Sequence, residues 1–433
     1  MVLAQEKNRD LKERAIRRVP LLLKHLERHL YLLTKEQVNS VIGPEPRIKI
    51  ALTFFTFIII GANDGALGVI LPSIQSHYHA DKATIGLLFL CSTVGYLTGS
   101  FNNGLLLEKL GRQRFLLLGT LAFLLGTILL CLMPPFPLLL AAYAVLGIGI
   151  SLLDPGLNAY IASLPRSTAL LNYLHAFYGV GAWLGPVLAS TLLVLQWGWN
   201  GVYVAWGGLC LLAMIGFSIF FRGLGGQSLD EEGEAVKGNV MWMALRLRVV
   251  WLAALFLLFY VGAEVSLGNW SFSFLTEERH SNLLISGWVV SGYWFGLTLG
   301  RVILAHASER IGNRALIQLC LVGVVLGLLL IWFVPFQLVA AAGLLLVGFC
   351  LGPIFPTAIA LMPNMVPSRL VPSAIGFLAS LSAVGGSLCP WLAGTLAEHL
   401  GLWTLLPFVI ALTGGMLCLW LALQLLPGSK ESA

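Results

Sequence analysis

The first strongly apolar segment of the chain carries an amide and a carboxylate at its centre. Asn63 and Asp64 lie within the run from Ile58 to Pro72, whose other members are glycine, alanine, branched aliphatic residues and the final proline. A carboxylate in hydrocarbon costs about 2.5–3.5 kcal/mol on insertion scales, so it is expected to face a bundle interior or a water-filled cavity. Because desolvation favours the neutral form of a carboxyl group, such a group can exchange protons near neutral pH. The sequence therefore predicts that this stretch handles protons inside a membrane.

Two further acids and one arginine lie inside apolar segments. Asp154 is followed at i+4 by Asn158, which places the two side chains on one helix face. Glu264 and Arg301 lie in apolar segments of the second half of the chain. We take Asp64, Asp154 and Glu264 as candidate proton-coupling residues, and the sequence leaves open whether Asp64 or Asp154 carries the proton. The alternative for each acid is a structural role, in which it binds backbone groups or a buried donor.

Membrane helices must position these residues, because the composition excludes an ordinary soluble protein. Of the 433 residues, 58% are hydrophobic and 11% are charged, whereas a soluble chain carries about 25% charged residues. Apolar runs of about 20 residues recur, and each is long enough to cross a hydrocarbon core of about 30 Å as a helix. The sequence predicts an all-α polytopic membrane protein with twelve transmembrane helices. Their expected bounds are 48–76, 84–107, 114–133, 137–163, 170–195, 200–221, 246–275, 283–307, 314–334, 336–362, 372–398 and 403–425.

Polar segments divide the chain into five predicted parts. The run Pro20–Leu33 has its leucines on one helix face, which is typical of a helix lying on a membrane surface, with docking to a partner as the alternative. The glycine- and acid-rich stretch before residue 246 indicates a flexible linker. The predicted parts are a cytoplasmic tail with the amphipathic helix over 1–47, an N-terminal six-helix half over 48–221, a cytoplasmic linker over 222–245, a C-terminal six-helix half over 246–425, and a cytoplasmic C-terminal tail over 426–433.

The basic residues predict the orientation. With the N-terminus in the cytoplasm, only Lys82 and Arg279 of the 26 Lys and Arg residues fall on the outer side, as the positive-inside rule requires. We therefore expect a multi-pass membrane protein with both termini cytoplasmic, in the plasma membrane rather than an organelle membrane. The net charge of +6 follows from this distribution and does not indicate nucleic-acid binding. The sequence offers no nucleophile–base set, phosphate loop or metal cluster, so we expect no enzyme activity, no catalytic residue and no metal.

An internal repeat links the two halves. Gly61 and Gly262 begin similar stretches 201 residues apart, and the same offset recurs in three further places. The other matches at this offset are Gly95 and Gly99 with Gly296 and Gly300, Glu108–Arg114 with Glu309–Arg314, and Gly147 and Pro155 with Gly348 and Pro356. Parallel six-helix repeats imply a pseudo-two-fold axis along the membrane normal and a cavity between the halves near the midplane. The repeat also makes Glu264 the counterpart of Asn63.

The loop Glu108–Arg114 and its copy Glu309–Arg314 resemble motif A of the major facilitator superfamily. Within this superfamily the chain most resembles the fucose–proton symporter group and its fungal relatives. The residues that carry this second resemblance are Asn172, His175, Gly179, Gly181, Gly185 and Pro186 in one span, Gly149, Asp154 and Asn158 in another, and Gly352–Thr357 in a third. The resemblance implies two pseudo-symmetric six-helix halves in the major facilitator fold, and it covers about residues 48–425.

The resemblance also implies which residues form a gate. In the family, the motif A acid pairs with a loop arginine and faces a helix N-terminus of the other half, which latches the cytoplasmic side. The expected gating residues are Glu108, Lys109, Gly111, Arg112 and Arg114, their counterparts Glu309, Arg310 and Arg314, and the intramembrane Arg301. The alternative is that these charges serve only to orient the chain in the membrane.

Polar and aromatic residues within the spans are the candidates for solute binding. Amides and hydroxyls bind polar solutes, histidine can also relay protons, and aromatic rings can stack on a solute or anchor a helix at the membrane interface. The candidate substrate-binding residues are Asn63, Asn158, Asn172, His175, Tyr178, Asn269, Trp270 and Tyr293. Packing within the bundle is the alternative for each of them.

Together these features predict a secondary active transporter working by alternating access. We expect it to move a small polar solute, with a sugar as the first class, and to use the proton gradient rather than a cofactor as its driving force. Its partners would be the small-molecule substrate, protons and the lipid bilayer, with no nucleic acid, and the protein would act as a monomer. The alternatives are a proton antiporter that exports an amphipathic metabolite or drug, and a nutrient receptor that does not transport.

Overall fold

The computed structural model describes residues 44–165, 167–222 and 240–425, excluding the side chains of residues 44–46, 168, 169, 240 and 305–309. The predicted amphipathic helix Pro20–Leu33, most of the predicted tail and linker, and residues 426–433 lie outside this description. The arrangement given below is that of residues 52–425.

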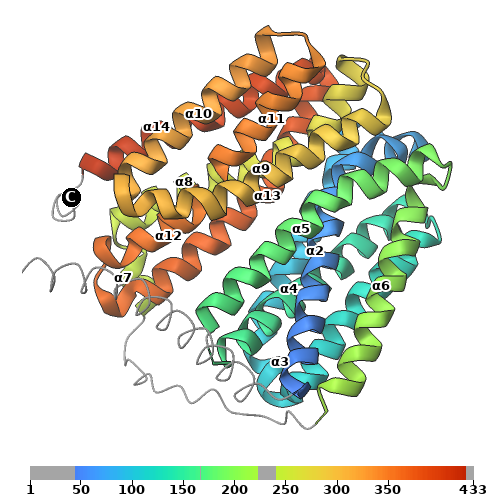
Figure 1. The fold of residues 1–433 in the computed structure, drawn as a ribbon, viewed down its shortest axis with the longest axis vertical. Helices are drawn as coiled ribbons and strands as arrows, with labels where there is room; N and C mark the ends of the chain where they lie inside the picture. The colour runs from blue at the N-terminus through green and yellow to red at the C-terminus, as the bar shows by residue number, and fades with distance from the viewer. Residues whose placement is uncertain (1–43, 166, 223–239, 426–433) are drawn as a thin grey trace, which may run out of the picture. The chain divides into compact units, whose positions relative to one another are not determined.

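The N-terminal half consists of five long helices that make six crossings. They are α2 (Pro44–Tyr78), α3 (Lys82–Cys131), α4 (Phe136–Ala162), α5 (Ser167–Val194) and α6 (Gly198–Phe220) (Figure 1). α3 has 50 residues, which is too long for one crossing, and it is interrupted at Gly111, where φ is 71° and ψ is 162°. Only glycine adopts such a conformation without strain. The interruption separates the second predicted span from the third.

The C-terminal half repeats this order with more breaks. Its elements are α7 (Val240–Ala244), α8 (Arg248–Ser273), η1 (Phe274–Glu278), α9 (Leu283–Ile311), α10 (Asn313–Phe333), α11 (Gln337–Leu351), α12 (Ile354–Met365), η2 (Ser368–Leu370), α13 (Val371–Leu400), η3 (Leu402–Thr404) and α14 (Leu405–Leu425). α9 and α10 are separated at Gly312, with φ of 81° and ψ of 150°, which repeats the geometry of Gly111. α11 and α12 are separated at Gly352 and Pro353, because proline has no N–H for the helical ladder.

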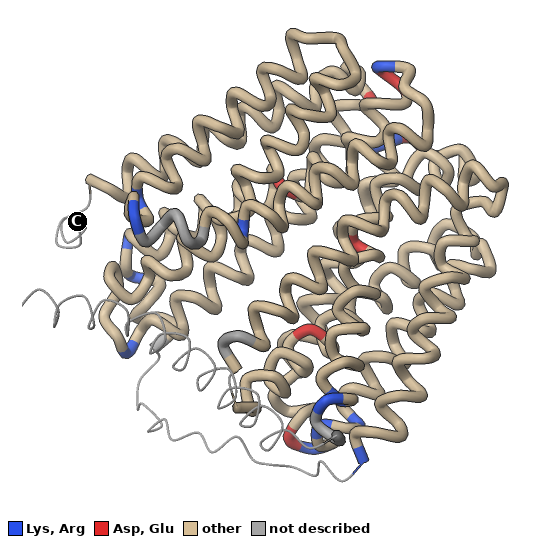
Figure 2. Tube along the Cα trace, viewed as in Figure 1, with Lys and Arg blue, Asp and Glu red and all other residues tan. Residues whose placement is uncertain are grey.

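The described helices confirm the predicted fold class. Eleven of them are long and apolar enough to cross a membrane, and Lys82–Cys131 contains two crossings on either side of Gly111. No strand occurs among the described residues. Charged residues are sparse along the middle of the described helices, whereas most of the described Lys and Arg lie toward one end of the bundle (Figure 2).

Packing within the two halves follows the sequence repeat. Gly95 of α3 approaches the carbonyl of Ala144 on α4 so closely that a Cβ would not fit, and Gly296 of α9 approaches the carbonyl of Leu345 on α11 in the same way. Both pairs are related by the offset of 201 residues. The matched glycines therefore sit at matched helix contacts, which is the physical reason that they recur in both halves.

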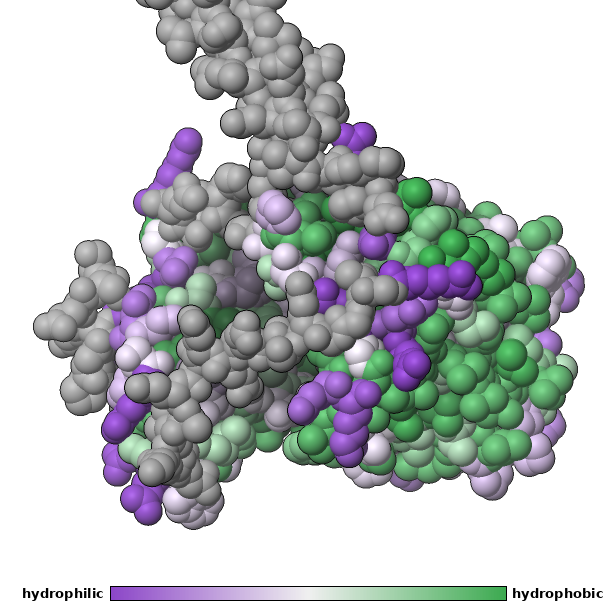
Figure 3. Space-filling view, turned by 90° about the horizontal axis from the view of Figure 1, so that it is seen from below, coloured by the Kyte–Doolittle hydropathy of each residue, from purple (hydrophilic) through white to green (hydrophobic). Residues whose placement is uncertain are grey.

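The halves meet along two helix pairs, α3 with α13 and α5 with α9. We call the end of the bundle that carries Lys82 the Lys82 end, and the opposite end, which carries Arg112, the Arg112 end. The half-to-half contacts of described side chains run from Gly179 and Thr298 near mid-depth to Lys82 itself. Seen from below, the surface is hollowed between two groups of hydrophilic residues (Figure 3).

Candidate functional site

Asp64 lies at mid-length in α2 and is held by a neighbouring helix of the same half. The Tyr178 hydroxyl of α5 donates to Asp64 Oδ2 at 2.8 Å, and Asn63 Nδ2 donates to Asp64 Oδ1 at 3.2 Å. The two helices come close enough because Gly61 of α2 lies against the backbone of Tyr178, and Gly181 of α5 lies against the backbone of α2. Asp64 forms no ion pair with a Lys or Arg of the described chain.

Asp154 makes its contacts within its own helix. Asn158, one turn later on α4, donates to Asp154 Oδ1 at 2.7 Å and to the Asp154 backbone carbonyl at 3.0 Å. Pro155 cannot donate to the helical ladder, and the Ser151 carbonyl that it leaves without a partner accepts from Asn103 Nδ2 of α3 at 2.8 Å. Asp154 also has no Lys or Arg ion-pair partner among the residues that the structure describes.

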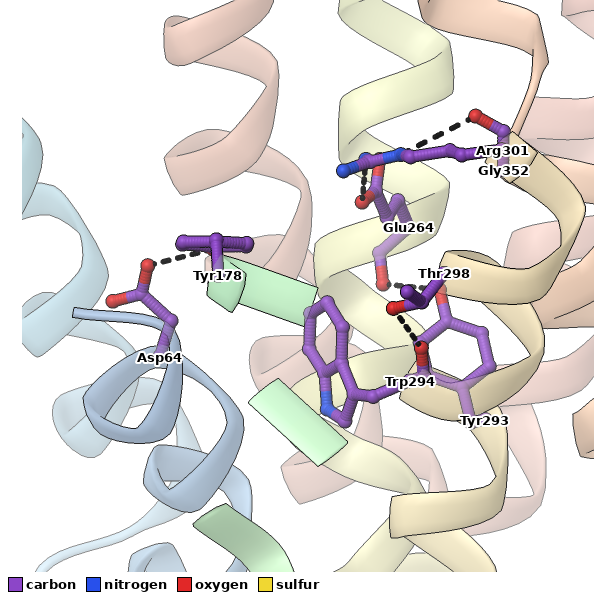
Figure 4. Close-up of polar contacts among 8 residues, drawn as sticks. All are labelled: Asp64, Tyr178, Glu264, Tyr293, Trp294, Thr298, Arg301 and Gly352. Carbon is purple, nitrogen blue, oxygen red and sulfur yellow. Dashed lines mark hydrogen bonds and ion pairs between the residues drawn. The ribbon is translucent and has the colours of Figure 1, made fainter. Parts of the chain in front are cut away.

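Glu264 differs from both aspartates because a cation neutralises it. Arg301 of α9 lies with its guanidinium NH2 at 3.3 Å from Glu264 Oε1, and its Nε donates to the Gly352 carbonyl at 3.3 Å (Figure 4). The Tyr293 hydroxyl donates to the Glu264 backbone carbonyl at 2.8 Å. The Glu264 side chain is 11% exposed and that of Arg301 is 33% exposed. The arginine predicted as a gating residue therefore forms an ion pair inside the C-terminal half.

The space between the Asp64–Tyr178 pair and the Glu264–Arg301 pair contains an indole. Trp294 of α9 lies there in Figure 4, and Thr298 donates to its backbone carbonyl at 3.0 Å. Trp294 Nε1 is buried and has no hydrogen-bond partner in the described chain. The same holds for Asn269 Oδ1, while the Tyr260 hydroxyl lies beside Glu264 and Arg301 without a well-formed hydrogen bond. Such groups are costly when unsatisfied, so they are candidates to bind polar groups of a solute once a change of conformation exposes them, because all three residues are buried here.

Tyr260 and Thr298 are absent from the candidates taken from the sequence. Tyr260 lies four residues before Glu264 and Thr298 three residues before Arg301, so each shares a helix face with a charged residue. That spacing is the signal that could have identified them.

The remaining substrate-binding candidates fall into two groups. Asn172 and His175 are exposed on α5, and the His175 ring lies 6.0 Å from that of Phe57. Trp270 and Tyr293 are fully buried, and Trp270 donates through its indole nitrogen to the Pro390 carbonyl at 2.8 Å. Trp270 and Tyr293 are therefore closed to solute in this conformation, and their role in substrate binding stays a prediction.

Among the described side chains, the motif A residues of the N-terminal half make no contact with the C-terminal half in this conformation. Glu108 is exposed and binds no other described residue, while Arg112 donates to Ser163 Oγ at 3.3 Å and lies over the Tyr160 ring at 5.6 Å. Both partners of Arg112 belong to its own half. Lys109, Arg114 and Arg310 are also at this end, and the Glu309 side chain lies outside the description. Motif A makes no described contact with the other half because the halves touch nearer the Lys82 end, where the half-to-half contacts of described side chains lie.

A metal-binding arrangement is not found in the described part of the chain, where no three His, Cys, Asp or Glu side chains gather. The site thus consists of carboxyl groups, one arginine, hydroxyls and aromatic rings. Such a set can bind a polar solute and exchange protons.

Known proteins resemble this chain along most of its length. Bypass of stop codon protein 6 of Saccharomyces cerevisiae is 26% identical over 84% of this chain and 80% of its own. A glucose/galactose transporter of Brucella abortus is 25% identical over 85% of this chain and 93% of its own.

Solved structures agree on the fold. The nucleoside transporter NupG matches with a TM-score of 0.73 and 12% identity, covering 87% of this chain and 99% of its own. The Escherichia coli fucose:proton symporter FucP matches with a TM-score of 0.59 and 17% identity, covering 87% of this chain and 98% of its own. These likenesses confirm the predicted fold.

The family model of the Major Facilitator Superfamily matches residues 53–286 and 263–433, which together include nearly all of both halves. Its members are transporters rather than enzymes, and the crossings found in the described helices agree with that model. The chain belongs to the major facilitator superfamily and is a multi-pass membrane transporter.

Proposed function

We propose that this transporter moves a small polar solute together with protons by alternating access, with sugars as the first substrate class to test. The sugar class is supported by the likeness to the glucose/galactose transporter and to the fucose:proton symporter. The driving force is the proton gradient, and no cofactor takes part. The transporter acts as a monomer, with both termini in the cytoplasm and the plasma membrane as its location.

The observation that carries the proposal is the contrast between the acids of the two halves. Glu264 has Arg301 as a cationic partner at 3.3 Å, whereas the side-chain donors to Asp64 in the described chain are the hydroxyl of Tyr178 and the amide of Asn63. A carboxylate without a cation in a low-dielectric site is stabilised by protonation. Asp64 is therefore the proton carrier that we favour, with Asp154 as a second acid farther toward the Arg112 end.

Alternating access is supported by the uneven contacts between the halves. Basic residues place the Arg112 end in the cytoplasm by the positive-inside rule. The described contacts between the halves lie from mid-depth to the Lys82 end, so this conformation is the one closed to the outside. Solute and proton would leave toward the cytoplasm from this state.

The test is uptake of radiolabelled sugars into proteoliposomes with and without an inward-directed proton gradient. Asp64→Asn removes the exchangeable proton with little change in volume, so we expect gradient-driven accumulation to be lost while solute exchange at equal pH persists. Asp81→Asn is the matched control, because Asp81 is an exposed loop residue, and it should accumulate solute normally.

Normal gradient-driven accumulation by Asp64→Asn would exclude Asp64 as the carrier, and the same assay on Asp154→Asn then tests the second acid. Solute extrusion driven by an inward proton gradient would favour the antiport alternative. Saturable solute binding without flux in the wild-type protein would favour the receptor alternative.

A further inference from the structure

One lysine links the two halves at the Lys82 end. Lys82, at the start of α3, places its Nζ at 2.9 Å from Glu277 Oε2, and its backbone N–H donates to Glu398 Oε2 at 2.9 Å. Glu277 lies in η1 after α8, and Glu398 lies near the end of α13. One residue of the N-terminal half therefore binds two acids of the C-terminal half.

The helix start explains why a carboxylate of the other half binds there. The first backbone N–H groups of a helix have no partner within the helix, and the positive end of the helix dipole attracts acids. Asp81, the N-cap of α3, accepts from the Thr84 N–H at 2.6 Å. The Lys82 N–H is left for Glu398, so the other half supplies part of the cap of α3.

The ion pair is also shielded from water on one side. The Lys82 side chain is 13% exposed, while that of Glu277 is 37% exposed. A partly buried pair is screened less by salt than a fully exposed pair. Lys82 is thus covered by the junction between the halves, and separating the halves would rehydrate it.

An apolar layer lies next to this ionic contact. Trp270 of α8 lies against Gly394 of α13, and its ring centroid is 6.4 Å from that of Phe89 on α3. A Cβ on Gly394 would lie 2.5 Å from the Trp270 ring and 2.9 Å from the Lys82 carbonyl oxygen. The rings and the ion pair therefore form one seal with two layers, and both layers join the halves.

The ionic layer is not part of the internal repeat. At the offset of 201 residues, the counterpart of Lys82 is Leu283 and the counterpart of Glu277 is Ser76. Neither can form this contact, so the duplication of the fold does not account for it. It is also separate from motif A, which lies at the opposite end of the bundle.

We propose that Lys82 is a gate residue, whose bonds to Glu277 and Glu398 hold the Lys82 end shut and must break before that end can open. The inference rests on the proposed alternating-access transport. In a gate of this kind the charge of Lys82 at the junction of the halves stabilises the closed state over the open state. A lysine with a merely structural role would leave the ratio of open to closed protein unchanged.

The test measures the separation of the halves directly. Spin labels are attached at Leu195 and Leu400, which are exposed at the Lys82 end on opposite halves, in a full-length chain whose native cysteines are replaced. Double electron–electron resonance in proteoliposomes then gives the populations of closed and open distances. Lys82→Gln is expected to raise the open-to-closed ratio up to about 5-fold, the scale of one such ion pair.

Five further variants separate the gate from a general loss of structure. Glu278→Gln removes the same charge as Glu277→Gln from an exposed neighbour that forms no ion pair with a described residue, so it should keep the wild-type ratio while Glu277→Gln raises it. Lys82→Arg keeps the cation and should also stay closed. The exchange Lys82→Glu with Glu277→Lys should restore the closed population that Lys82→Glu alone loses.

A ratio for Lys82→Gln equal to that of Glu278→Gln would overturn the gate. So would a charge exchange that fails to restore closure in a chain that unfolds at the wild-type temperature. The distance measurement does not depend on flux, so a wild-type chain that switches between states but shows no gradient-driven uptake would refute the proposed symport and leave the gate standing.

Discussion

Tyr178 on α5 donates its hydroxyl hydrogen bond to Asp64 on α2 at 2.8 Å, although 114 residues separate them in the chain. The bond joins the first and fifth crossings of the N-terminal half next to the junction with the C-terminal half. It gives the carboxyl group a neutral donor in place of a cation. Asp64 therefore contributes to the contact between α2 and α5, together with the close approach at Gly61 and Gly181.

Removing the hydroxyl should weaken coupling more than it weakens binding. Tyr178→Phe deletes a hydrogen bond to a charged acceptor, worth about 1.5–3 kcal/mol, so the ionised form of Asp64 is disfavoured and proton release becomes harder. We expect gradient-driven uptake to fall about tenfold or more at equal solute affinity. Uptake and isothermal binding at several pH values measure the two effects.

Tyr173→Phe is the control for Tyr178→Phe, because Tyr173 is an exposed tyrosine of the same helix. Equal uptake by both variants over the whole pH range would show that the hydroxyl of Tyr178 plays no part in coupling.

Breaking the Glu264–Arg301 pair should destabilise the fold. Arg301→Met leaves the Glu264 carboxylate buried without a cation, which costs about 3–5 kcal/mol. The double variant Arg301→Met with Glu264→Gln removes both charges and should recover most of the loss. Thermal unfolding in detergent gives the comparison, and a double variant no more stable than the single one would contradict the pairing.

The close approach of α2 and α5 should depend on Gly181. In Gly181→Ala the added Cβ meets the backbone carbonyl of Ile58, so the helices must move apart. We expect a loss of about 1–3 kcal/mol in the free energy of unfolding. Gly208→Ala is the control, because nothing lies within 4 Å of its Cβ and alanine favours the helix by about 1 kcal/mol. Equal melting temperatures for the two variants would refute this packing.

The cap of α3 should make stability depend on pH. The hydrogen bond from the Thr84 backbone N–H lowers the pKa of Asp81 below its ordinary value of 3.8. A lowered pKa in the folded state means that the ionised cap stabilises the protein above the unfolded pKa, and that this contribution is lost as the pH falls through the folded pKa. Asp81→Ala should cost about 1 kcal/mol at neutral pH.

The difference between wild type and Asp81→Ala should shrink when unfolding is measured near pH 3, about one unit below the ordinary pKa. Asp81→Asn keeps a capping oxygen, so its stability should stay close to that of the wild type at neutral pH. A difference between wild type and Asp81→Ala that is independent of pH would argue against an ionised cap.

The sequence by itself determined the class of protein, the number of crossings and the internal repeat. These depend on local properties, because apolar length decides whether a helix spans a bilayer and the glycines recur wherever two helices touch. Gly111 and Gly312 are an example, since their place in the repeated loop predicts the turn that interrupts α3 and the turn that separates α9 from α10. Asp64, Asp154 and Glu264 also stand out, because a charge in an apolar run is visible without a structure.

Only the tertiary structure decided which groups these acids meet. Arg301 and Glu264 are 37 residues apart and lie on different helices, so nothing in their spacing predicts that they pair. Trp270 appears in the sequence as an aromatic residue in a span, and only packing against α13 turns it into part of the seal at the Lys82 end. Lys82 looks like an isolated outer charge until the two halves are brought together. Contacts between distant segments depend on how the helices pack, and helix packing is a property of the whole bundle rather than of any one stretch of sequence.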